Sequence, residues 1–124
     1  MAIDSILDTV RAGMAQERMR LDAASRNIAN ANTALPVGVE AQRWQVDVGK
    51  AFSTHLQAVP VPSREVSDPG HPLADADGFV RYARVDTVQE MTTLMTASRG
   101  YEANVRSFNL LRGMTLRALE IGAK

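Results

Sequence analysis

The stretch "ASRNIANANT" (residues 24–33) interrupts a long helical pattern near the start of the chain. It places Asn27, Asn30 and Asn32 directly behind an apolar stripe, although the asparagine amide competes for backbone hydrogen bonds and disfavours a helix. One asparagine would be enough to end a helix in a left-handed turn. Because Asn27 and Asn30 lie on adjoining parts of one face, we favour a second role. Their amides would bond neighbouring backbones and fix the register of a packed helical assembly.

Upstream of this stretch, apolar residues recur at intervals of four and three positions. This spacing is a heptad seam, and it predicts one amphipathic helix that runs from the start of the chain to Asn27–Asn32. Glu17 is a charged interruption of the seam. The seam residues are Ile3, Leu7, Val10, Met14, Leu21, Ala24 and Ile28.

The last third of the chain repeats the pattern and predicts a second long helix. A capping box made by Thr87 and Glu90, or by Asp86 and Gln89, would begin it. Gly100, which has no side chain, would let another helix approach closely. The methionines of both helices are expected to fill the core. The second stripe consists of Met91, Leu94, Ser98, Tyr101, Val105, Phe108, Leu111, Met114, Ala118 and Ile121.

The middle of the chain has a different composition, with all five prolines and the single tryptophan. The alternating runs "RWQVDV" (43–48) and "LQAVPV" (56–61) predict one or two short strands, and "SDPGHPLADADGF" (67–79) predicts a turn-rich loop. We therefore predict a mainly α fold, with long N- and C-terminal helices paired as an antiparallel coiled coil and a small extended or β module between them. The expected parts are the N-terminal helix and turn (1–33), the β module (34–85) and the C-terminal helix (86–124).

Composition excludes several classes of function. The 14 basic and 14 acidic residues give no net charge, which argues against a nucleic-acid or anionic-membrane binder. There is no cysteine, so disulfides and thiolate metal sites are excluded. No run approaches the roughly 20 apolar residues of a membrane span. The N-terminus lacks the pattern of a cleaved secretory signal, and we expect none.

The acidic loop gives no good case for a metal site or for catalysis. "ADADGF" (74–79) resembles part of a calcium loop, but Leu73 and Arg84 stand where carboxylates are needed. His71 and Asp68 are too few ligands for a site of their own. With two histidines, no glycine-rich phosphate loop and no nucleophile elbow, we predict no enzyme, no metal and no cofactor.

Two helices with this few large apolar side chains cannot bury enough surface to be stable by themselves. We expect further helices, from other copies or relatives, to complete the packing, and we expect frayed termini in the isolated chain. The alternative is a soluble helical adaptor or secreted effector whose amphipathic helices bind a partner's groove. An enzyme remains possible only if the loop at 68–78 binds a cofactor.

Several motifs resemble those of a known family. "NIANANT" (27–33), close to the N-terminus, resembles the signature of the flagellar rod and hook axial proteins. The C-terminal half is similar to the proximal-rod members of that family. Residues 34–67 lie outside the similarity and are shorter than the family's middle segment. The similar motifs are "DPGHPLADADGFV" (68–80), "VDTVQEM" (85–91), "ASRGYEANV" (97–105) and "LEIG" (119–122).

The resemblance implies a structural subunit of the bacterial flagellar basal-body rod that transmits motor torque. It implies self-assembly through terminal helices that surround a channel, other rod subunits as partners, and a periplasm-spanning location. It also implies export by the flagellar type III apparatus without a cleaved signal, and no nucleic acid or small-molecule substrate. We expect subunit contacts at the turn and on the second helix, where Asn104 is carried over with "YEANV". The expected interface residues are Asn27, Ile28, Asn30, Asn32, Met91, Leu94, Ser98, Tyr101, Asn104, Val105 and Phe108.

Overall fold

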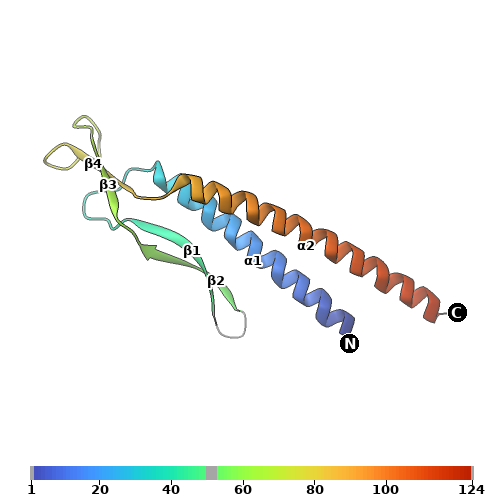
Figure 1. Cartoon of the computed structure of the whole chain (residues 1–124). Helices are drawn as coiled ribbons and strands as arrows, with labels where there is room; N and C mark the ends of the chain where they lie inside the picture. Colours follow the sequence, from blue (N-terminus) through green and yellow to red (C-terminus); the bar gives the residue numbers. More distant parts are fainter. Residues whose placement is uncertain (1, 50–52, 124) are drawn as a thin grey trace.

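The computed structural model describes residues 2–49 and 53–123. Met1, residues 50–52 and Lys124, which belong to the predicted parts at 1–33, 34–85 and 86–124, lie outside the described residues. Two long helices flank a small β module made of two antiparallel hairpins, and this arrangement confirms the predicted mainly α architecture (Figure 1). The elements are α1 (Ala2–Ala31), β1 (Gln42–Val48), β2 (Thr54–Pro60), β3 (Ser63–Ser67), β4 (Phe79–Ala83) and α2 (Thr87–Gly122).

The two helices lie side by side and run in opposite directions. Asn104 of α2 lies against Gly13 of α1, whereas Gly100, one turn earlier in α2, lies beneath Glu17, one turn later in α1. Both ends of the chain therefore lie at the same end of the helix pair, and α2 extends past the start of α1 (Figure 1).

Small residues are the most deeply buried part of the contact between the helices. The buried apolar residues of the pair are Ala23, Ala24, Ala31 and Ala97. Alanine and glycine let two helix axes approach closely. Of the α1 seam predicted from spacing, Ala24 is buried, Ile3 is exposed, and the other residues are half-buried: Leu7, Val10, Met14, Leu21 and Ile28.

The methionines show the consequence of this small-residue contact. In α2, Met91, Met95 and Met114 are 52%, 59% and 57% exposed, so the prediction that they fill the core was wrong. Their exposure arises because α2 packs against α1 along one face only.

The first hairpin consists of the two strands that the alternating runs predicted. β1 pairs with β2 from Gln42 opposite Pro60 to Val48 opposite Thr54. Pro60, which has no N–H to donate, is the last residue of β2, as expected of a proline in an edge strand.

The second hairpin, β3 with β4, was not predicted. It pairs Ser63 with Ala83 and Ser67 with Phe79, and the turn-rich loop joins its two strands. The Oδ1 atom of Asp75 accepts hydrogen bonds from the N–H groups of Asp77 (3.0 Å) and Phe79 (2.9 Å). Gly78 adopts the positive φ of 82° that this turn requires. The carboxylate of the calcium-like loop therefore shapes a turn.

The start of α2 decides between the two predicted capping pairs. Asp86 is the N-cap, and its side chain accepts a hydrogen bond of 3.2 Å from the N–H of Gln89. The alternative pair, Thr87 with Glu90, does not form because the Glu90 carboxylate bonds Arg43 instead.

Enlarging a residue in the small-residue contact is expected to destabilise the helix pair. Ala24 is 1% exposed, so Ala24→Leu forces the helices apart and lowers the free energy of unfolding by about 1–3 kcal/mol. Ala29→Leu, at an exposed site on the same helix, is the control and changes the stability by less than about 0.5 kcal/mol. Thermal unfolding followed by circular dichroism measures both, and equal stabilities would contradict the assigned contact.

Candidate subunit interface

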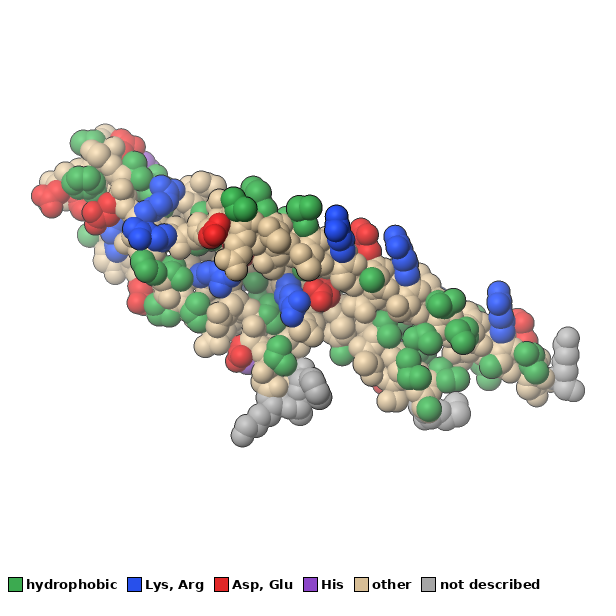
Figure 2. Space-filling model, in the orientation of Figure 1, with side chains coloured by type: hydrophobic (Ala, Val, Ile, Leu, Met, Phe, Trp, Pro, Cys, Tyr) green, Lys and Arg blue, Asp and Glu red, His purple; other side chains and the backbone are tan. Residues whose placement is uncertain are grey.

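Large apolar side chains gather at the free end of the helix pair. Figure 2 shows them around the ends of α1 and α2, where the described chain leaves them uncovered. We call this set the terminal apolar patch. It consists of Ile3 (40% exposed), Ile6 (47%), Leu110 (67%), Met114 (57%), Leu116 (52%), Leu119 (63%) and Ile121 (77%).

The patch surrounds α2 instead of lying on one side of it. Leu119 and Ile121 are two positions apart, so their side chains point roughly 160° away from each other around the helix. Both are more than half exposed. A helix that is apolar on several sides is typical of a buried helix, so more than one neighbour is needed to cover it.

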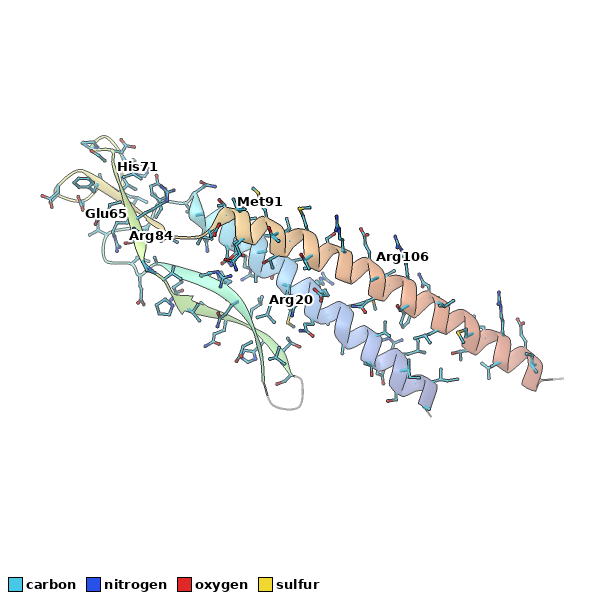
Figure 3. The ribbon with its side chains drawn as sticks, viewed as in Figure 1. Arg20, Glu65, His71, Arg84, Met91 and Arg106 are labelled. Atoms are coloured by element: carbon cyan, nitrogen blue, oxygen red, sulfur yellow. The ribbon has the colours of Figure 1, made fainter. Side chains whose placement is uncertain are left out.

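The residues predicted as interface on α2 differ in how far their own chain covers them. Met91 points away from α1, as does Arg106 (Figure 3). Asn104 lies against α1 beside Gly13. Leu94 and Ser98 line an open groove with Leu21 of α1. Of the predicted residues on α2, those that are half-buried are Leu94, Ser98, Tyr101, Asn104, Val105 and Phe108.

Tyr101, which belongs to both the second stripe and the predicted interface, is half-buried. Within the described residues its hydroxyl makes no hydrogen bond that would tie it to the helix pair.

The asparagines of the opening motif lie in different environments. Asn27 is 0% exposed, whereas Asn30 is half-buried and Asn32 is exposed just after the end of α1. Asn32 makes one long bond of 3.4 Å to the carbonyl of Ile28, itself half-buried. Of the four residues predicted as interface at this turn, Asn27 is thus covered by its own chain.

Asn27 joins α1 to the first hairpin. Its Nδ2 donates to the Trp44 carbonyl at 2.7 Å, and its Oδ1 accepts from the Trp44 N–H at 2.7 Å. The amide does bond a neighbouring backbone, as expected, but that backbone belongs to the same chain. Contacts of Asn30 and Asn32 with another subunit stay a prediction.

A buried ion pair beside Asn27 was missed by the sequence analysis. Arg43 donates from Nε to Oε1 of Glu90 at 2.7 Å, and the Glu90 side chain is 3% exposed. Spacing alone could not have found it, because Glu90 shares the heptad position of Ala97, whose burial is seen only in the structure.

The described residues contain no helix long and apolar enough to cross a membrane. Within the same residues, no group of three or more acidic, histidine or cysteine side chains is arranged to hold a metal ion.

Comparison with known proteins gives two family matches at the two helical regions. Residues 7–34 match the flagella basal body rod protein family, and residues 76–121 match the C-terminal family of flagellar basal body rod FlgEFG proteins. Residues 35–75, which contain both strands of the first hairpin, lie outside these two matches.

The chain is also similar over nearly its whole length to proteins named flagellar basal-body rod protein FlgC. The relative from Salmonella typhimurium is 35% identical, with 98% of this chain and 99% of the relative covered. The relative from Bacillus subtilis is 31% identical, with 94% of this chain and 95% of the relative covered. The relative from Aquifex aeolicus is 31% identical and 97% of each chain is covered.

Removing Arg43 is expected to leave a buried carboxylate without its partner. Arg43→Ala lowers the free energy of unfolding by about 2 kcal/mol. This is below the full cost for a buried pair, because the Arg43 side chain is 33% exposed and water screens it. Adding Glu90→Gln recovers part of the loss, since a neutral amide is easier to bury. Denaturant unfolding measures both variants. An equal loss in Arg117→Ala, at an exposed site, would contradict the assignment.

Proposed function

The chain belongs to the FlgC family of flagellar basal-body rod proteins and is therefore a structural subunit of the rod, and we propose that it assembles through its two terminal helices to transmit motor torque. The observation that carries this proposal is the terminal apolar patch. Its seven large side chains, including Leu110 and Leu119, are 40–77% exposed in the single chain. Burial of one such side chain contributes about 1.5–3 kcal/mol, so neighbouring subunits would gain much by covering them.

The helices of neighbouring subunits would complete a coiled-coil wall around a channel. Within one chain, the pairing of α1 and α2 leaves Leu94 and Val105 of the second stripe only half-buried. Helices of adjacent subunits, packed at these flanks and around the patch, would supply the missing knobs-into-holes partners. Such a wall resists twisting because each helix is held from several sides.

The other rod subunits are the expected partners, and the periplasm is the expected place of assembly. Export would use the flagellar type III apparatus, without a cleaved signal. A chain whose core is mainly alanine would also be easy to unfold for export, because alanine buries little apolar area. The proposal assigns no catalytic step and no cofactor. Membership of the rod family favours it over the alternative of a helical adaptor.

Charged residues in the patch are expected to block assembly without unfolding the chain. Leu110→Asp with Leu119→Asp places two carboxylates where neighbouring helices would pack. In cells that lack their own copy of this protein, the double variant should support no swimming and be absent from purified basal bodies. Because both sites are exposed, the isolated chain should lose only about 0.5 kcal/mol per site from weaker helix propensity.

Asn109→Asp is the matched control for this experiment. It adds a carboxylate to the exposed side of the same helix but removes no apolar surface. We expect it to swim and to enter basal bodies. Normal swimming of the double patch variant would refute assembly through the patch.

The free end of α2 is expected to fray in the isolated chain. In the register set by Gly13 with Asn104 and by Glu17 with Gly100, the residues from Leu116 onward lie past the start of α1. Their apolar side chains are uncovered, so their amides should exchange hydrogen rapidly in dilute monomer. In purified basal bodies the same amides should be protected, as mass spectrometry of exchanged peptides can measure. Full protection in dilute monomer would contradict the need for neighbours.

A further inference from the structure

Two successive residues of β1 are hydrogen-bonded to the two helices. Trp44 is bonded by Asn27 of α1, and Arg43 by Glu90 of α2. Trp44 is held through its backbone N–H and C=O, and Arg43 through its side chain. We call these four residues the helix–hairpin joint.

The Asn27 side chain takes the place of a third strand at the edge of β1. In a strand, the N–H and C=O of one residue point to the same side, and a neighbouring strand normally bonds both. Here the carboxamide of Asn27 provides one acceptor and one donor, as a peptide group does, and bonds both atoms of Trp44 at 2.7 Å. Ala58 of β2 is paired with Trp44 on the other side. The joint thus secures the backbone of the hairpin, not only a side chain.

The ring of Trp44 adds a second contact to α1. The guanidinium of Arg26 lies 4.9 Å from its centroid, within the range of a cation–π interaction. A cavity between β1 and the two helices borders the joint, and Ala23, Trp44 and Ala97 are among the residues that line it. The hairpin therefore rests on the joint and is not packed tightly along its whole length.

Two side chains of the helix–hairpin joint are buried, so each depends on its hydrogen-bond partner. Asn27 and Glu90 are 0% and 2% exposed, so a side chain that loses its partner remains buried in the folded chain. A buried donor or acceptor without a partner carries its full desolvation penalty. Asn27 comes from α1 and Glu90 from α2, so both are correctly placed only when the two helices are paired.

We propose that the helix–hairpin joint fixes the position of the β1–β2 hairpin on the helix pair and makes that position depend on the pairing of α1 and α2. Asn27 is the positioning residue of this device. Its role is internal to the folded chain, whereas Asn30 and Asn32 remain the candidates for contacts with neighbours. This inference concerns the single chain and does not depend on assembly into the rod.

The single tryptophan of the chain makes the proposal testable by fluorescence. In Asn27→Ala, the released hairpin exposes Trp44 to water. Its emission should shift to longer wavelength, acrylamide should quench it more strongly, and its amide should exchange roughly tenfold faster or more. Far-UV circular dichroism checks that the helices remain. Arg43→Ala should loosen the hairpin in the same sense, because it removes the bond to α2.

Two matched controls come from the same motif. Asn30→Ala and Asn32→Ala remove the same amide within five residues of Asn27, but neither side chain bonds the described residues of the hairpin. Both should leave the emission, quenching and exchange of Trp44 as in the unaltered chain. Trp44 signals that are unchanged in Asn27→Ala, or equally changed in Asn32→Ala, would overturn the proposal.

Asn27→Asp separates lost hydrogen bonds from general destabilisation. At neutral pH its carboxylate can accept from the Trp44 N–H but cannot donate to the carbonyl, so Trp44 should be released. Below pH about 4 the protonated carboxyl regains a donor and should restore protection. The unaltered chain at the same pH values controls for Glu90, Arg26 and Arg43 around the joint. Release that is equal at both pH values would overturn the two-bond mechanism.

Discussion

The alanine contact between α1 and α2 is the constraint on which the rest of the structure depends. Ala24 and Ala97, both 1% exposed, let the helix axes come close, and Gly100 makes room for the stem of Glu17. A contact this close between two helices leaves the larger side chains of both stripes half-buried or exposed. The alanine contact that pairs the helices therefore leaves apolar side chains uncovered in the single chain, and these side chains suit an assembly of many helices.

The sequence predicted the elements better than it predicted which residues they bury. Heptad spacing found both helices, and the pair Asp86 and Gln89 was one of two caps considered. Spacing ranks positions by hydrophobicity, so it included Met91, which is exposed, and left out Ala97, which is buried. The hairpin of β3 and β4 was missed because "SREVS" is short and polar. Its strands are joined by residues whose composition is typical of a loop. Pairing across that loop leaves no local pattern in the sequence.

In the asparagine motif, spacing indicates which side chain is buried but not which group it bonds. Asn27 lies between the buried Ala24 and Ala31 at intervals of three and four, on the buried stripe of α1, whereas Asn30 and Asn32 lie off it. Periodicity could thus have marked Asn27 as buried. It could not have found the partner, because Trp44 is bonded through its backbone and any residue type presents the same two atoms. Partners of that kind become visible only in three dimensions.

A joint made to a backbone has a consequence for how the subunit can vary. Asn27 and Glu90 lie in the two segments that match rod families, and Arg43 and Trp44 lie in the segment outside those matches. The bonds of Asn27 require only a strand edge at hydrogen-bonding distance from its side chain. The side chains of the hairpin can therefore change while its backbone stays attached to α1. The pair of Arg43 and Glu90 is more demanding, since it needs a cation at one position of β1. One half of the joint therefore supplies a general attachment, and the other ties that attachment to this particular hairpin.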